Sequence, residues 1–320
     1  MADGAHPVAG VDYPRNYHEL VSWFPDDAAC LRYLERLRWR GGFSCRFCGQ
    51  VGGSYWRMGD GLRRCAACRR ETSVTAGTIM DKTRTPLVSW FAAVWYVVNQ
   101  KNGVSALGLQ RVLGLGSYQT AWAWLHKLRR AMVCPGREPL TGAVEVDETL
   151  IGGVKPGRPG RSRDGKALVV IAVECHDGGP GRARMQRITN ASADVLSEFV
   201  LDNVARGSEV RTDAWRGYND FGRYRFSHVV TNIHESGDPA HVAMPEVHRV
   251  ASLLKRWLLG THQGAVSHDF YLDEFTFRFN RRRSRHRGLL FYRLLQQVVA
   301  TDPQPYKELT APEPVSSGPP

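Results

Sequence analysis

The sequence predicts an α/β protein that is assembled from more than one domain, and three observations lead to this prediction. Two Cys-x-x-Cys pairs lie near the start of the chain, within residues 26–80. From Gly142 onward, helical periodicity gives way to short β-rich runs that are separated by turns and one helical stretch. After Pro245 the pattern is helical again. Strands followed by helices are typical of α/β and α+β domains.

Composition and charge narrow the class of protein. The chain has 320 residues, of which 42% are hydrophobic, enough for a substantial core. A formal charge of +12 favours a polyanionic partner, most simply nucleic acid. The sequence has no apolar run of about 18 residues and no charged start followed by an apolar stretch. We therefore expect a cytoplasmic protein with no membrane span and no secretion signal.

The first elements are an N-terminal extension over residues 1–25 and a helix over residues 26–40. Asp26 or Asp27 can cap this helix, and Gly41 ends it. The apolar residues of the helix follow a roughly helical stripe: Leu31, Tyr33, Leu34, Leu37 and Trp39.

Next come the two cysteine pairs, which predict a zinc ribbon within residues 26–80. Sixteen residues separate the pairs, a spacing that suits a closed four-thiolate zinc site: Cys45, Cys48, Cys65 and Cys68. The total of seven cysteines is odd, which together with the paired spacing favours metal over disulfides. A closed site of this kind has a structural role. Six arginines in this region favour phosphate contact, although solvated side chains are the alternative: Arg46, Arg57, Arg63, Arg64, Arg69 and Arg70.

Residues 81–138 read as a helical DNA-binding segment. We expect helices over residues 86–101, 105–113 and 117–132, and the last two flank a glycine-containing turn, which is the outline of a helix-turn-helix. Several side chains of the last helix suit base or phosphate contact, although Trp122 could belong to the core: Tyr118, Gln119, Thr120, Trp122, Trp124 and His126.

Residues 139–300 are expected to form a single α/β domain, followed by a disordered tail over residues 301–320 that contains six prolines. The β-rich runs cover residues 143–147, 167–174, 184–188, 209–212 and 228–231, with a helix over residues 193–203. Three more helices are expected over residues 246–259, 267–280 and 289–300.

Two aspartates in this domain predict metal-dependent chemistry on phosphodiesters. Asp147 and Asp213 each close a strand-like run, and carboxylates at the ends of neighbouring strands can hold two divalent cations about 4 Å apart. Either one alone could simply cap a turn. His248 and Lys255 follow on a predicted helix, and their spacing of seven residues places them on one side, about 20° apart.

Four motifs in this order resemble the DDE-type transposases of bacterial insertion sequences that begin with a zinc ribbon. The motifs are VDETLIGG at residues 146–153, TDAWRGY at 212–218, SLLKRW at 252–257 with Gly260 and Thr261, and YLDEFTFRFNRR at 271–282. The resemblance extends from about Asp26 to Gln297. It implies a ribonuclease-H-like (retroviral-integrase-like) catalytic core that uses two catalytic ions, Mg²⁺ or Mn²⁺.

Site residues follow from the resemblance. Asp147 and Asp213 match the first two acidic ligands, and His248 occupies the position of the third, where a glutamate is expected. An imidazole can ligate Mg²⁺ or, more readily, Mn²⁺. Glu246 is the alternative third ligand, but about 200° separate it from His248 on a helix, so the two cannot both face the metals. Lys255 matches a basic residue that contacts a phosphate or a terminal base.

Two further features surround these residues. Glu145 shares the strand face of Asp147 and is expected to be either an outer-shell group or solvated. Residues 278–287 form an arginine-rich stretch that is expected to bind the DNA backbone, with a solvated face as the alternative: Arg278, Arg281, Arg282, Arg283, Arg285 and Arg287.

The resulting prediction is a two-metal-ion DNA transposase, a polynucleotidyl transferase and endonuclease that cleaves and joins DNA at the ends of an insertion sequence. Its expected partners are double-stranded DNA, as terminal inverted repeats and target, and further copies of the chain on that DNA. It would act in the bacterial cytoplasm, in association with the nucleoid. Two alternatives remain: an inactive or domesticated zinc-ribbon DNA-binding protein, and a structure-selective nuclease of the same fold.

Overall fold

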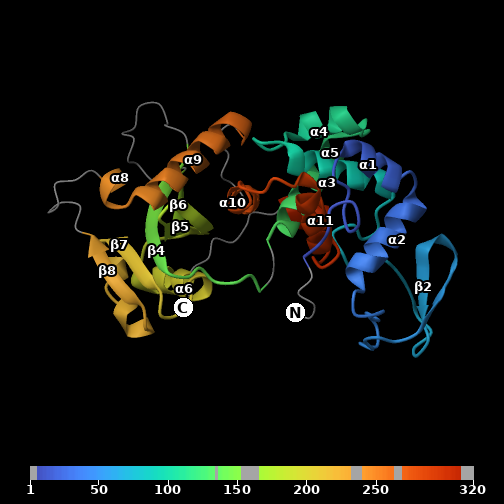
Figure 1. Ribbon diagram of the computed structural model, residues 1–320, viewed down its shortest axis with the longest axis horizontal. Coiled ribbons are helices and arrows are strands. Elements are labelled where there is room, and N and C mark those ends of the chain that lie inside the picture. Colours follow the sequence, from blue (N-terminus) through green and yellow to red (C-terminus); the bar gives the residue numbers. More distant parts are fainter. Residues whose placement is uncertain (1–5, 134–135, 153–165, 232–239, 263–268, 311–320) are drawn as a thin grey trace. The chain divides into compact units, whose positions relative to one another are not determined.

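A computed structural model describes residues 6–133, 136–152, 166–231, 240–262 and 269–310 (Figure 1). The chain divides into two compact units. We call Met1–Cys134 with Ser284–Thr310 the helical unit, and Pro135–Arg283 the sheet unit. Each unit has its own core and is described separately.

The helical unit is built around aromatic packing. Phe24 lies beside Tyr33, Phe91 and Phe291, with ring centroids 4.6–6.0 Å apart. Asp26 caps the second helix by accepting a hydrogen bond from the N–H of Ala29, which settles the choice between Asp26 and Asp27. The helices are α1 (Tyr17–Trp23), α2 (Asp27–Arg38), α3 (Leu87–Asn99), α4 (Ala106–Leu113), α5 (Tyr118–Ala131), α11 (Arg287–Val298) and α12 (Tyr306–Thr310).

The last two helices differ from the sequence-based expectation. Helix α11 was expected within a domain over residues 139–300, but it packs against α2, α3 and α5 of the helical unit. Its buried Phe291 contacts Phe91 and Trp95. Helix α12 lies in the stretch expected to be disordered, and its Leu309 is fully buried. Residues 311–320 of that expected tail lie outside the described residues.

The ribbon consists of three short antiparallel strands in the order β1-β2-β3. They are β1 (Tyr55–Arg57), β2 (Leu62–Cys65) and β3 (Glu71–Ser73), with a 3-10 turn, η1 (Gly59–Gly61), between the first two. Glu35 of α2 holds the ribbon, because it pairs with buried Arg63 at 2.7 Å and accepts a hydrogen bond from Tyr55 at 2.6 Å. Arg63 is therefore a structural residue and not a surface cation.

The two helices and the glycine-containing turn of the expected helix-turn-helix outline are present. Helix α4 ends at Gly114, whose φ of 61° is left-handed, and Ser117 caps α5. Two of the expected DNA-contacting side chains are core residues, since Trp124 stacks on Trp90 at 3.9 Å and His126 is fully buried. On the same helix, Tyr118 and Gln119 are exposed.

The sheet unit contains, within the described residues, a five-stranded mixed sheet in the order β6-β5-β4-β7-β8. Its strands are β4 (Ala143–Ile151), β5 (Ala167–His176), β6 (Gly179–Ile188), β7 (Glu209–Asp213) and β8 (Ser227–Thr231). Strands β4, β5 and β6 pair antiparallel, whereas β7 runs parallel to β4 and β8 parallel to β7. The expected α/β character and the positions of the five expected strands agree with this sheet, although β4 and β6 are longer than expected.

Helices cover both faces of this sheet (Figure 1). On one face, α6 (Ala193–Asn203) packs over Val144, Val146 and Val170. On the other, α9 (Pro245–His262) and α10 (Phe270–Asn280) pack over Val169, Ile171 and other apolar residues. The remaining short elements are η2 (Arg216–Tyr218), η3 (Phe221–Tyr224) and α8 (Ala240–Ala243). None of the helices in the described part of the chain has the length and apolar character needed to span a membrane.

Candidate functional site

The four cysteines of the ribbon lie together. Cys45 Sγ is 3.6 Å from Cys68 Sγ, and Cys48 Sγ is 3.8 Å from Cys65 Sγ. A tetrahedral zinc ion with Zn–S bonds of about 2.3 Å separates its sulfurs by about 3.8 Å, so these thiolates fit zinc. Among the described residues, this is the group of three or more potential ligands whose ligand atoms all lie within 4.8 Å of one another.

Local backbone geometry explains how the two cysteine pairs form the site. In each knuckle the residue after the second cysteine has a left-handed conformation and donates its N–H to the carbonyl of the first cysteine: Gly49 to Cys45, and Arg69 to Cys65, both at 3.0 Å. Burial acts to raise the pKa of the Cys45 thiol, but the N–H groups of Cys48 and Phe47 outweigh it and lower that pKa to about 6. The thiolate form, which binds metal, is thereby favoured.

The two aspartates lie on adjacent strands of the sheet unit. The parallel pairing of β4 with β7 aligns Glu145 with Arg211, so two residues further on Asp147 and Asp213 are level and share a face. Asp213 ends β7, as expected. Asp147 does not end its strand, because β4 continues to Ile151 by pairing with β5. The open edge at Asp147 therefore arises because the pairing of β4 with β7 ends at Glu145 and Arg211, and not because β4 ends.

The surroundings of Asp147 disfavour its charged form. Burial raises the pKa of Asp147 to about 6, the charge of Asp213 adds to this effect, and the charge of Lys255 opposes it. Asp213 also accepts a hydrogen bond from the N–H of Trp215 at 3.0 Å, so it caps the turn as well. A divalent cation bound by both carboxylates would relieve the repulsion between Asp147 and Asp213.

Helix α9 brings a third side chain to this pair. His248 Nδ1 lies 3.8 Å from Asp147 Oδ2, and the two side chains are 29% and 19% exposed. Glu246 points elsewhere, since its Oε1 lies near Gly179, the first residue of β6. Of the two possible third ligands, His248 is the one beside Asp147. With the two aspartates it offers oxygen and nitrogen donors, the kinds of atom that can bind Mg²⁺ or Mn²⁺.

Two glutamates beside Asp147 are more closely involved than their sequence positions indicate. Glu148 accepts a hydrogen bond from buried Tyr218, and burial raises the pKa of Glu148 to about 7, with that hydrogen bond opposing the shift. Glu145 is 3% exposed and binds the backbone at the start of α9. Glu145 is therefore not solvated. The two-residue period of a strand predicts which face of β4 each glutamate occupies, but it does not predict the groups that hydrogen-bond to it.

The arginine-rich stretch divides into structural and exposed members. Arg278 is 13% exposed and pairs with buried Glu274 at 2.6 Å, which removes it from the expected DNA-binding surface. Arg281 packs over Phe277, and Arg282 packs over Phe279. The side chains classed as exposed are Arg282, Arg283, Arg285 and Arg287; the first two lie in the sheet unit and the last two in the helical unit.

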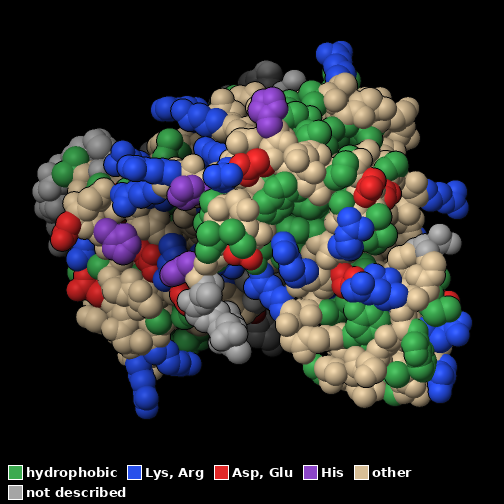
Figure 2. Space-filling view, turned by 45° about the vertical axis from the view of Figure 1, so that its right-hand side comes forward, with side chains coloured by type: hydrophobic (Ala, Val, Ile, Leu, Met, Phe, Trp, Pro, Cys, Tyr) green, Lys and Arg blue, Asp and Glu red, His purple; other side chains and the backbone are tan. Residues whose placement is uncertain are grey.

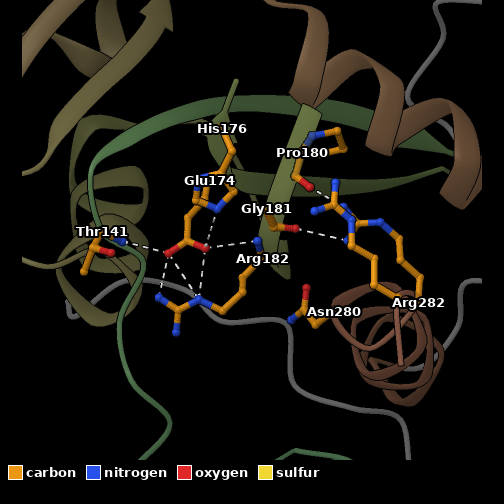
Figure 3. Close-up of a pocket in the computed structure, with 9 residues that line it drawn as sticks. Thr141, Glu174, His176, Pro180, Gly181, Arg182, Asn280 and Arg282 are labelled. Atoms are coloured by element: carbon orange, nitrogen blue, oxygen red, sulfur yellow. Dashed lines mark hydrogen bonds and ion pairs between the residues drawn. The ribbon is translucent and has the colours of Figure 1, made fainter. Parts of the chain in front are cut away.

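Arg282 and Arg283 line a pocket of about 380 Å³ at the start of β6 (Figure 3). Arg282 donates hydrogen bonds to the carbonyls of Pro180 and Gly181. On the opposite side of the pocket, Glu174 is neutralised by Arg182 at 2.6 Å. The other charged side chains that line the pocket are the basic Arg282 and Arg283. Lys and Arg side chains are prominent on the face of the molecule drawn in Figure 2.

Comparisons with known proteins match the two segments of the chain that contain these residues. A family model described as an ISXO2-like transposase domain matches residues 139–280, and a model described as a transposase zinc-ribbon domain matches residues 25–71. The first match contains both aspartates, His248 and Lys255, and the second contains all four cysteines. A search of curated proteins finds no match to the chain.

Proposed function

Because the chain belongs to the IS1595 family of DDE transposases with an N-terminal zinc ribbon, we propose that it binds insertion-sequence ends and catalyses DNA strand cleavage and strand transfer. The observation that carries this proposal is the placement of His248 beside Asp147, on the strand face that Asp213 shares. The mixed sheet with helices on both faces supports a ribonuclease-H-like core for residues 139–280.

Within this proposal, Asp147, Asp213 and His248 are the ligands of the catalytic divalent ions. When bound, two such ions would supply activation of a water or 3′-hydroxyl for in-line attack and stabilisation of the leaving oxygen. Asp147 and Asp213 lie on the paired strands β4 and β7, and His248 lies on α9, which packs over β4. We expect Lys255 to contact a phosphate of the DNA end, because it is exposed on α9 and its charge acts on Asp147.

DNA contact is proposed for exposed basic groups in each unit. Arg283 lies at the basic pocket of the sheet unit. In the ribbon, Arg69 lies over exposed Trp56, and Arg46 and Arg70 lie over exposed Phe47. Arginines and aromatic rings that share a surface suit sugar-phosphate and base contact. Terminal inverted repeats, target DNA and assembly of several copies on DNA belong to the same proposal.

The test is a cleavage and joining assay with purified protein and labelled duplexes that carry the element ends. We expect nicked and joined products with Mg²⁺ or Mn²⁺, and their loss in Asp213→Ala while DNA binding persists. Binding without products under either metal would instead identify a DNA-binding protein. Cleavage that follows junction shape and ignores the end sequence would identify a structure-selective nuclease.

A further inference from the structure

Glu145 connects the strand of Asp147 to the helix of His248. It lies on β4, two residues before Asp147 and on the same strand face, and it is 3% exposed. Its Oε2 accepts hydrogen bonds from the backbone N–H groups of Glu246 and Val247, both at 2.8 Å. These donors lie in the first turn of α9, which begins at Pro245.

The first turn of a helix needs acceptors from outside the helix. Its backbone N–H groups have no partner within the helix, and a side-chain oxygen just before the helix normally satisfies them. Met244, which precedes α9, has no side-chain oxygen. Glu145 supplies the acceptor from another element, and its negative charge is also favourable at the positive end of the helix dipole.

This contact ties the ligands of the proposed metal site together. His248 directly follows Val247, so the hydrogen bonds that fix the start of α9 also fix where the imidazole emerges. We propose that Glu145 is a positioning residue that anchors the start of α9 to β4 and thereby keeps His248 at Asp147. The inference rests on the proposed function for its catalytic meaning, but the anchor itself can be tested without catalysis.

Glu174 provides a matched control for a purely structural role. It is also 3% exposed, lies on the neighbouring strand β5, and accepts backbone hydrogen bonds from Thr141 and Arg182. None of these donors belongs to α9. Loss of Glu174 should therefore destabilise the sheet unit without changing the start of α9.

The experiment compares Glu145→Ala, Glu145→Gln and Glu174→Ala in the full zinc-loaded chain. Without divalent metal added, we expect Glu145→Ala to speed amide hydrogen exchange at Glu246 and Val247 by about tenfold or more. Glutamine keeps an acceptor oxygen, so Glu145→Gln should retain most of the protection. Mn²⁺ affinity, measured by calorimetry, should fall about tenfold in Glu145→Ala, as is typical for partners that orient a metal ligand, and should recover in Glu145→Gln.

Unchanged exchange at the start of α9 in Glu145→Ala, or an unchanged Mn²⁺ affinity, overturns the positioning role. An equal loss of Mn²⁺ affinity in Glu174→Ala also overturns it, because the effect would then follow from general destabilisation. If these measurements agree with expectation but the unaltered protein does not cleave element ends, the proposed function fails and the anchor stands.

Discussion

His248 occupies the position where a glutamate is expected from the family resemblance, and the structure places its ring beside Asp147. We expect His248→Ala to reduce cleavage by at least about 100-fold, the upper end of the effect typical for groups that only orient a ligand. Glu246→Ala should leave cleavage near that of the unaltered chain, since Glu246 lies towards Gly179. The reverse result in the cleavage assay would assign the third ligand to Glu246.

Gly49 is a second place where one residue decides local structure. Its φ is 72°, and nothing lies within 4 Å of an added Cβ, so alanine introduces backbone strain alone. This strain is about 1–2 kcal/mol in the left-handed region. We expect Gly49→Ala to lower zinc affinity about tenfold in competition with a chelator.

Gly41→Ala is the control for this prediction. Gly41 also has open space around its Cα but no left-handed φ, so its substitution should leave zinc affinity unchanged. An equal loss in both variants would show that strain at Gly49 is not the cause.

At the scale of elements, Glu174 joins β5 to β6 and to the segment before β4. Burial acts to raise its pKa, but hydrogen bonds from the Arg182 side chain and from the backbone of Thr141 and Arg182 outweigh this and hold that pKa below its ordinary value. A carboxylate of this kind stabilises the fold above its unfolded pKa, and the contribution is lost as the pH falls through the lower folded pKa.

We therefore expect Glu174→Gln to lower the Tm of the sheet unit most at neutral pH, with a difference that shrinks as the pH falls below about 4.5. Thermal unfolding followed by circular dichroism across this range measures the difference. Exposed Glu198, on α6, is the control, since Glu198→Gln should change Tm little at any pH. A Tm difference for Glu174→Gln that does not vary with pH would contradict the assigned cause.

At the scale of the whole molecule, the helical unit is formed by both ends of the described chain. A chain that ends at Arg283 loses α11 and with it Phe291, which is buried among aromatic residues of that unit. We expect hydrogen exchange to increase throughout α2 and α3, whereas β4, β5 and β7 stay protected. Truncation after Thr310 is the control and should change neither unit. If α2 and α3 keep their protection in the chain that ends at Arg283, α11 does not belong to the helical core.

Zinc removal should likewise act on one part of the molecule. Few apolar residues pack within the ribbon besides those around the cysteines, so its strands depend on the metal. We expect a chelator to release one zinc per chain and to abolish exchange protection over residues 43–73. The strands of the sheet unit should remain protected, because they have their own core. Loss of protection in both units would show that their stabilities are linked.

Local patterns in the sequence were sufficient for those features that depend on nearby residues. Cys-x-x-Cys spacing predicted the four cysteines that lie together, Ser105, Gly114 and Ser117 delimited two helices, and β-rich runs located the strands. These predictions succeeded because a metal knuckle, a helix cap and a strand period are each defined within a few residues.

Patterns of this kind did not show which distant surfaces meet. The helical pattern over residues 289–300 did not indicate which core buries α11, and the arginine-rich stretch did not reveal that Arg278 pairs with Glu274.

The sequence by itself indicated the family, the four cysteines that lie together and the two aspartates on adjacent strands. Tertiary structure decided which unit receives α11, which of Glu246 and His248 approaches Asp147, and that Glu145 binds the start of α9. The physical reason is that these contacts join groups about a hundred or more residues apart, and their geometry exists only after the sheet and its covering helices have packed.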